Sequence, residues 1–393
     1  MTDNQELVRL LRGQLPEVAV LREELHRWPD LSGDEQATRD LLRNHLPELQ
    51  FYPVADTGGI LVGRGTQPRI ALRVELDGLP ITEQSGVPWS SQRSEAMHAC
   101  GHDVHAAAAV AVVRALQARA DTDTRPSVAL ILQPREEKPP SGARDVVQSG
   151  ILQDLGVCAV IGAHLQPALT PGAISCTPGA VNASADEFVI EIRGRPGHGA
   201  YPHLCDDVVL AMAASINALQ QVVARNIDPM QPATITIGSM HAGSAANVLP
   251  ETAQAKGTIR ALGSEVRALL IARMNDIVES TAMAYGCVAE VSLHVGEPAL
   301  VNHEALTHET ARVLTELDIA VDQKFRSMGA DDFSYFGDQL PALMMFVGVD
   351  SSQGGLHHPG FAPNHAVIDL VAQAFLAGYL GAEALISNED QRR

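Results

Sequence analysis

Short apolar segments recur along the chain and are separated by segments of helical character. Residues 128–132, 157–161 and 343–347 contain only apolar side chains, which is typical of strands covered on both faces. The alanine- and valine-rich segment 104–119, which precedes the first of them, predicts a buried helix. Strands that alternate with helices predict the α/β class, with a mostly parallel sheet and helices on both of its faces.

The rest of this layered arrangement is predicted at the two ends of the chain. Leucines at helical spacing predict helix through the first forty residues, followed by strands at 60–62 and 70–76. A closing helix is expected at 370–385, and the segment 138–142 is the clearest irregular loop. The chain has 393 residues, which is long enough for a sizeable core in one large domain or two ordinary ones.

The middle of the chain has a different order of elements. Its pattern is strand, helix, strand, strand, helix, strand, at 188–192, 207–225, 233–237, 253–260, 265–285 and 288–294. This β-α-β-β-α-β order predicts a small ferredoxin-like α+β unit inserted into the larger domain. We therefore expect a catalytic domain in two parts, 1–181 and 296–393, with an inserted domain at 182–295. The alternative is that these elements extend the main sheet.

Charge and composition exclude several classes of partner. The net charge of −19 disfavours nucleic acid, because phosphates would be repelled. The polar, acidic start argues against a secretory signal, and no apolar run approaches the ~18 residues of a membrane helix. Five scattered cysteines suggest no disulfide framework. We expect a soluble protein of the cytoplasm that binds neither nucleic acid nor membrane.

Polar side chains follow the expected strands at their carboxyl ends. They are Asp77, the doublet Glu136-Glu137, His164 and, in a glycine-bounded loop, His357. Ligands of open α/β sheets bind outside the carboxyl ends of the strands. These side chains are therefore expected to meet at one site.

The residue types at these positions favour a metal site. Cys100 and His102 offer a thiolate and an imidazole two residues apart, and thiolate, imidazole and carboxylate together suit zinc. Two metal ions ~3.5–4 Å apart need about five protein ligands. The set Cys100, His102, Glu137, His164 and His357 supplies five. The other glutamate of the doublet is free to act as a general base.

Each signal has a plainer alternative when taken alone. A single Cys-x-His is a weak metal signal, a glutamate pair is usually solvated surface, and a lone histidine is more often a core residue. In the inserted segment, the loops around His198 and Asn247, and Arg260 at the end of a strand, could bind a substrate carboxylate or could simply form turns and ion pairs. The hypothesis rests on the joint placement of the ligands at strand ends.

The chain resembles a known family of metal-dependent amidohydrolases. The family includes hippurate hydrolases, plant auxin-conjugate hydrolases and bacterial N-acyl-amino acid aminoacylases, which are relatives of carboxypeptidase G. Eight motifs carry the resemblance in the family's order over nearly the whole length: 73–80, 97–103, 133–137, 162–164, 197–203, 247–250, 328–334 and 356–359. The resemblance implies a catalytic α/β domain with an inserted lid domain through which the chain forms a homodimer or a higher homo-oligomer.

The resemblance also implies roles for individual residues. Cys100 would bridge two divalent metal ions, zinc first, with manganese, cobalt or nickel as alternatives, and His102, Glu137, His164 and His357 would complete the ligand set. Glu136 would be the general base and acid, and Asp77 would orient the site. His198 would help polarise the scissile carbonyl. Asn247 and Arg260 would contact the substrate.

Three positions depart from the family pattern. Residue 75 is Glu where this branch commonly has Asp, residue 331 is Asp where Glu is frequent, and the loop 138–142 lacks the usual glycines. None of these changes removes an expected ligand or the base. They bear on substrate preference more than on catalysis.

The expected reaction is hydrolysis of the amide bond of an N-acyl-L-amino acid. Metal-activated water would attack the acyl carbonyl while Glu136 shuttles the proton. An alternative keeps the site and changes the substrate to a dipeptide, an N-carbamoyl-amino acid or N-acetyldiaminopimelate. A remote alternative is an inactive homologue that binds metal or ligand.

Overall fold

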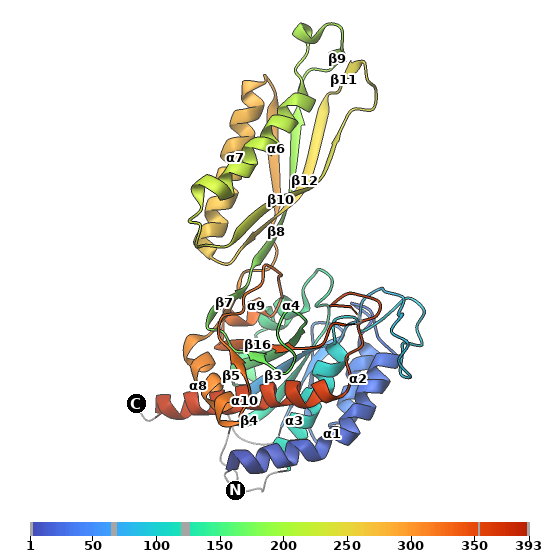
Figure 1. The fold of residues 1–393 in the computed structure, drawn as a ribbon, viewed down its shortest axis with the longest axis vertical. Coiled ribbons are helices and arrows are strands. Elements are labelled where there is room, and N and C mark those ends of the chain that lie inside the picture. Colours follow the sequence, from blue (N-terminus) through green and yellow to red (C-terminus); the bar gives the residue numbers. More distant parts are fainter. Residues whose placement is uncertain (1–2, 64–68, 119–125, 353, 391–393) are drawn as a thin grey trace. The chain divides into compact units, whose positions relative to one another are not determined.

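The computed structural model describes residues 3–63, 69–118, 126–352 and 354–390 of the chain (Figure 1). The chain forms two compact units. The first comprises 1–179, 301–325 and 332–393, and the second comprises 180–300 together with 326–331. The second unit thus receives a short segment from beyond the predicted insertion.

The first unit is built on an eight-stranded sheet. Its strand order is β1 (Gln50–Val54), β2 (Gly58–Val62), β4 (Ser127–Gln133), β3 (Arg69–Glu75), β5 (Val157–Gln166), β16 (Ala342–Gly348), β6 (Ile174–Ser175) and β15 (Val321–Asp322). The central strands β4, β3, β5 and β16 are parallel to one another. Their carboxyl ends therefore lie at one edge of the sheet. The predicted α/β class with a mostly parallel sheet is confirmed.

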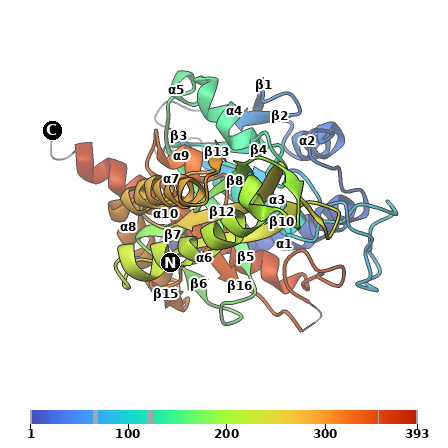
Figure 2. The ribbon, with the colours of Figure 1, turned by 90° about the horizontal axis from the view of Figure 1, so that it is seen from above.

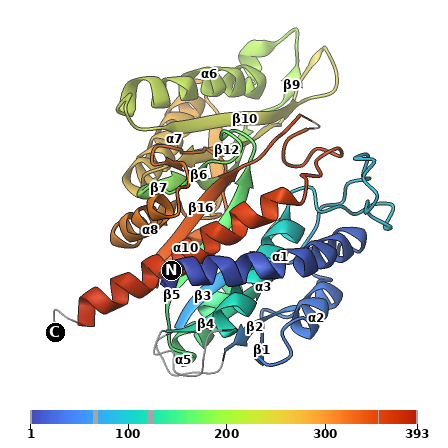
Figure 3. The ribbon, with the colours of Figure 1, turned by 60° about the horizontal axis from the view of Figure 1, so that its bottom comes forward.

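Three long helices pack together: α1 (Asp3–Arg27), α3 (His102–Gln117) and α10 (Ala366–Asp390) (Figure 3). Helices α3 and α10 contact the central strands, and α1 packs on these two helices. Helix α3 is apolar on almost every side and nearly all of it is buried, as expected for a helix enclosed by other elements. Its side chains join those of the central strands in one hydrophobic core. The smaller helices of this unit are α2 (Gln36–Asn44), α4 (Gly142–Gln148), α5 (Ile151–Asp154), α8 (Glu304–Glu316) and α9 (Ser334–Gly337).

Several local predictions for the first unit are wrong. The first forty residues form two helices with a break between them, because the segment between Arg27 and Gln36 turns at Pro29 and Gly33. Strand β1 and helix α8 were not predicted. The predicted irregular loop at 138–142 is confirmed for 138–141, and helix α4 begins at Gly142, where the Ser141 side chain caps its first turn by accepting from the Arg144 N–H.

The second unit contains an antiparallel four-stranded sheet. Its order is β10 (Ala233–Ala242), β12 (Thr252–Ala261), β8 (Ser184–Arg193) and β13 (Val288–His294). Helices α6 (Val208–Asn226) and α7 (Ser264–Ala284) lie side by side along this sheet (Figures 1 and 2). Burial alternates along β8, because only one face of the sheet is covered by the helices. This is the predicted ferredoxin-like order.

The second unit has its own sheet, so its elements do not extend the main sheet. Short elements complete the two units: β7 (Gly179–Asn182), β9 (Gly197–His198), the 3₁₀ turn η1 (Pro202–Leu204), β11 (Val248–Leu249) and β14 (Leu300–Asn302). None of these short elements was predicted, because two to four residues are too few to show a periodic pattern.

Two helices are longer and more apolar than we predicted from the sequence. Residues 208–226 and 366–388 have the length and mean hydropathy of a membrane-spanning helix, so the prediction that no apolar run approaches this length is wrong. Within α10, 67% of the apolar window is buried in the chain, and this helix is part of the hydrophobic core of the first unit. A buried core helix passes the same length and hydropathy test as a membrane span, so these two helices are weak evidence for a membrane protein.

Candidate metal centre

The site begins at the amino end of helix α3. Gly101 has a φ of 85°, a left-handed conformation that glycine adopts without strain, and it separates Cys100 from His102 at the start of the helix. The Nδ1 atom of His102 lies 2.7 Å from the carbonyl oxygen of Asp77, to which it donates a hydrogen bond. This hydrogen bond leaves Nε2 with a free lone pair, which is the form of imidazole that binds metals.

Glu137 lies between two histidines. Its Oε1 atom is 3.8 Å from Nε2 of His102, and its Oε2 atom is 3.5 Å from Nε2 of His357. The backbone N–H of Glu137 donates to the Oδ2 atom of Asp77 at 3.0 Å, and the Ser32 hydroxyl donates to the same oxygen at 2.7 Å. Asp77 therefore orients both His102 and Glu137, one through its carbonyl and one through its carboxylate.

Cys100 and His164 form the other side of the site. The Sγ atom of Cys100 lies 3.4 Å from Nε2 of His164, whose Nδ1 donates to the carbonyl oxygen of Leu165 at 2.7 Å. His164 was expected after a strand, but β5 continues through it to Gln166. The strand continues because β16 pairs with it over this whole stretch, with Phe346 opposite His164.

These side chains have the geometry of a cation site. One ligand atom from each of Cys100, His102 and Glu137 lies within 4.8 Å of the other two. Nε2 of His102 and Oε1 of Glu137 are buried, and neither has a hydrogen-bond partner among the described residues. Leaving a buried polar atom unpaired costs about 1–3 kcal/mol. A cation between sulfur, nitrogen and oxygen donors would satisfy these atoms, so the residues present fit a bound divalent metal ion.

Two causes shift the pKa values at this site, burial of the side chains and the carboxylates gathered around them. Burial raises the pKa of the Cys100 thiol well above its usual range, and Glu137 and Glu136 raise it further. Burial would lower the pKa of His102, but Glu75, Glu137 and Asp77 raise it above its usual value. This excess of negative charge favours a cation.

Glu136 lies next to the group formed by Cys100, His102 and Glu137 and is not a member of that group. Its Oε2 atom is 3.9 Å from Nε2 of His102. The two adjacent glutamates thus both reach the same imidazole nitrogen.

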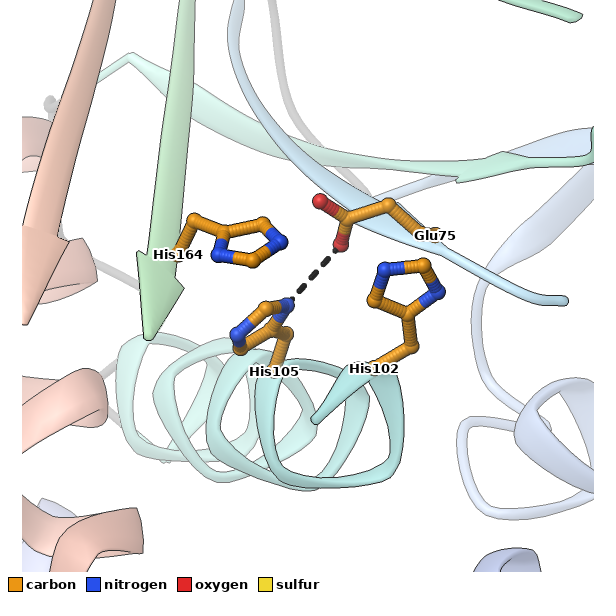
Figure 4. Close-up of side chains that lie close together, drawn as sticks. All are labelled: Glu75, His102, His105 and His164. Atoms are coloured by element: carbon orange, nitrogen blue, oxygen red, sulfur yellow. Dashed lines mark hydrogen bonds and ion pairs between the residues drawn. The ribbon is translucent and has the colours of Figure 1, made fainter. Parts of the chain in front are cut away.

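A second cluster lies directly behind His102 (Figure 4). Glu75, His102, His105 and His164 all offer ligand atoms within 4.8 Å of one another and all four are buried. Nδ1 of His105 donates to Glu75 Oε2 at 3.1 Å, and Nε2 of His105 accepts the Leu165 N–H at 3.0 Å. Because both nitrogens of His105 are engaged, His105 has no lone pair left for a metal ion.

The other expected site residues belong to the second unit. His198 on β9 pairs with Val248 on β11, and the carbonyl oxygen of Asn247 accepts the Gly199 N–H at 2.8 Å, so His198 and Asn247 are neighbours. The Nδ1 atom of His198 accepts the Ala200 N–H at 3.0 Å, which leaves its Nε2 edge as the donor. Arg260 lies on the central strand β12, opposite Ala185 and Thr234.

Residues 71–375 match the family described as peptidase family M20/M25/M40. The chain belongs to this family. The match includes the whole first-unit site and all of the second unit. It agrees with the resemblance drawn from the eight motifs.

Relatives within the M20/M25/M40 family are similar over almost their whole length. The chain is 36% identical over 371 residues to an N-acetyldiaminopimelate deacetylase of Geobacillus thermodenitrificans, covering 93% of this chain and 97% of the relative. It is 35% identical over 378 residues to an N-acetyl-L-cysteine deacetylase of Bacillus subtilis, covering 95% and 89%. A solved structure from Bacillus subtilis, a dinuclear metal-binding peptidase of family M20, superposes with a TM-score of 0.83 at 28% identity, covering 95% and 99%. The chain is an amide-hydrolysing enzyme of this family.

Sequence reasoning missed the buried residues around the M20 site. Glu75 was noticed only as a departure, and His105, Arg73 and Asp332 were not assigned a role. One signal was present. Arg73 and Glu75 are charged residues in the mostly apolar strand β3, and buried charges require partners. The identity of those partners depends on residues from distant parts of the chain.

Proposed function

We propose that this chain hydrolyses the amide bond of N-acyl-L-amino acids, with N-acetyl amino acids as the first substrates to test. The observation that carries the proposal is the donor set of Cys100, His102 and Glu137, with Glu136 beside it. Two relatives that match over most of their length are named for the removal of an acetyl group from an amino acid. Both names support an N-acyl amino acid as the substrate class.

We propose two divalent metal ions, zinc first and manganese, cobalt or nickel as alternatives, held by Cys100, His102, Glu137, His164 and His357. When bound, the ions would supply Lewis-acid polarisation of the acyl carbonyl and lower the pKa of water towards ~7. The thiolate among the donors favours zinc. The contacts of Asp77 with His102 and Glu137 support a role for Asp77 in orienting the ligands.

Glu136 would move the proton. It takes a proton from the attacking water and delivers it to the departing nitrogen. A C–O bond forms and the amide C–N bond breaks, which gives a carboxylate and a free amine. General acid–base catalysis of this kind contributes about 10²–10⁴-fold in rate.

For the second unit we propose the role of a lid and dimerisation domain with limits near 182–295. His198 would donate a hydrogen bond to the scissile carbonyl, and Asn247 and Arg260 would bind the substrate carboxylate. A homodimer, or a higher homo-oligomer, in the cytoplasm is the proposed assembly. Light scattering on the purified full chain measures the assembly, and a monomer would reject this part of the proposal.

The substrate proposal is tested by a panel assayed for released primary amine. The panel contains N-acetyl-L-amino acids including N-acetyl-L-cysteine, N-acetyl-L-diaminopimelate, N-benzoylglycine, dipeptides and N-carbamoyl-amino acids, each with zinc-, manganese- and cobalt-loaded protein. Turnover of several N-acyl-amino acids is expected. Turnover restricted to dipeptides or to carbamoyl compounds would reject the acylase assignment. Turnover of the diaminopimelate derivative alone would narrow it to that substrate.

A further inference from the structure

His105 is fully buried and has a hydrogen bond at each ring nitrogen. Its Nδ1 donates to the Glu75 carboxylate and its Nε2 accepts the backbone N–H of Leu165. A nitrogen that accepts an N–H bond carries no proton, so the imidazole is neutral and held in one tautomer. The ring, which is carried by helix α3, therefore connects Glu75 on strand β3 to Leu165 on strand β5 at a fixed distance.

Glu75 is itself held from its other side. Its Oε1 accepts from Arg73, whose guanidinium also donates to Asp332 at 2.7 Å and to Gln133 Oε1 at 2.7 Å. Gln133 and the Ser141 hydroxyl donate to the same Asp332 carboxylate. Removing one partner of a buried ion pair costs about 3–5 kcal/mol. Rotation of Glu75 away from His105 would break this network, so the carboxylate is a rigid anchor.

Three members of this network lie close in sequence to a proposed metal ligand or to the proposed base. His105 lies one helical turn after His102, and Leu165 follows His164 directly. Gln133 is the last residue of β4, just before the Glu136-Glu137 doublet. The network therefore joins β3, β4, β5 and α3 beneath the site.

We propose that His105 is a positioning residue of the metal centre, and that with Glu75 it sets the separation between His102 on α3 and His164 on β5. This inference rests on the proposed function, because it takes His102 and His164 as metal ligands. His105 does not touch the metal ions or the substrate. It acts through the two elements that present the ligands, as outer partners of metal ligands do.

The positioning role of His105 requires a side chain at position 75 that is long enough to reach both Arg73 and His105. Glu75 bridges Arg73 beside it on β3 and His105 on α3. Aspartate is one methylene shorter, so Glu75→Asp can keep Arg73 but withdraws from His105. We expect Glu75→Asp to resemble a His105 variant in metal binding and to remain closer to wild type in stability than Glu75→Ala.

The test measures the affinity of the full-length, metal-free protein for Zn²⁺ by competition with a chromophoric chelator. His105→Ala is expected to lose about 10–100-fold in affinity. His105→Asn retains a donor towards Glu75 and His105→Gln retains an acceptor for the Leu165 N–H, so each should recover part of the loss. The absorption of Co²⁺-loaded protein, including the thiolate-to-cobalt band of Cys100, is expected to change in His105→Ala and to return partly in the amide variants.

Two controls separate this role from general destabilisation and from failure of the ligand assignment. Asn302→Ala removes a buried side chain in the same unit that hydrogen-bonds to the backbones of Thr177 and Met344, neither of which is a proposed ligand. It should lower the free energy of unfolding and leave Zn²⁺ affinity unchanged. Glu137→Gln removes a proposed ligand and should weaken binding.

Each outcome decides between the two proposals. Unchanged affinity in His105→Ala, or equal losses in His105→Ala and Asn302→Ala, would overturn the positioning role. Unchanged affinity in Glu137→Gln would reject the ligand set instead. Loss in Glu137→Gln and His105→Ala, with Asn302→Ala unaffected, supports both.

Discussion

The thiol of Cys100 lies 3.4 Å from Nε2 of His164, and the ring of His164 is oriented by the bond from its Nδ1 to the Leu165 carbonyl oxygen. Burial lowers the pKa of His164 to about 3. Burial and the two glutamates raise the pKa of Cys100. Without metal, a neutral thiol therefore faces a neutral imidazole. When a cation binds, the thiol of Cys100 would lose its proton and the imidazole would not.

Metal affinity is predicted to rise with pH. A thiol whose pKa lies above the working pH must lose its proton when a metal binds, so affinity should increase about tenfold per pH unit for each proton released. Chelator competition at several pH values, with proton release followed in weakly buffered solution, measures this slope. Cys100→Asp replaces the thiol by a more acidic group and should flatten the slope. An identical slope in both proteins would contradict the prediction.

Substitutions of the two adjacent glutamates are predicted to have different effects on activity and on metal binding. Glu136→Gln should keep the fold and the bound metal but lose about 10²–10⁴-fold in kcat, because a proton acceptor is removed. Glu137→Gln should lose metal affinity first and activity as a consequence. Metal content by emission spectrometry and kcat at saturating metal separate the two. Full activity in Glu136→Gln would reject its role as the base.

Deprotonation of His26 is predicted to lower the free energy of unfolding of the protein at alkaline pH. Its Nδ1 lies 2.9 Å from Asp103 and its Nε2 lies 3.2 Å from Glu83. Burial would lower its pKa, but Asp103 and Glu83 raise it to about 9. A raised pKa in the folded state gives stability that is fully present below about pH 6.5 and is lost as the pH rises through about 9. The expected loss is at most about 3 kcal/mol.

Urea unfolding at pH 6, 7.5 and 9.5 measures this loss. The chain has two tryptophans, Trp28 and Trp89, and both belong to the first unit, so their fluorescence reports the unfolding of that unit. His26→Gln cannot gain the proton and should show a smaller decline between pH 6.5 and 9.5. Parallel declines in wild type and variant would show that His26 is not responsible.

Gly101→Ala is predicted to damage the site through the backbone. A left-handed φ costs a residue with a Cβ roughly 1–2 kcal/mol, and a Cβ here would lie 2.6 Å from Leu165 Cδ1. Gly86 has a similar φ of 73° but has open space around it. Gly86→Ala should therefore show only the backbone cost, whereas Gly101→Ala should lose more stability and also metal affinity. Equal effects of the two substitutions would reject a steric role for Gly101.

The sequence determined the fold class and indicated which residues to propose as metal ligands. Short continuous apolar segments are typical of central strands, and polar residues that follow parallel strands lie at the edge of the sheet where those strands end. For this reason Asp77, Glu137 and His357 could be expected to meet. Cys100 and His102 lie at the start of helix α3 and were grouped with them by their residue types and by the family resemblance. The inserted unit could also be predicted, because its strands and helices are long enough to show their periods.

Only the tertiary structure decided how these ligands are held. The partners of Glu75 are Arg73 on its own strand and His105 on α3, and the network continues to Asp332, which is more than 250 residues away in sequence. No periodic pattern specifies such pairs. They arise because each charged group buried by the packing of strands and helices must find its partner among the side chains that packing brings near. Short elements such as β9 and β11 were decided in the same way, by pairing with each other and not by their own sequence.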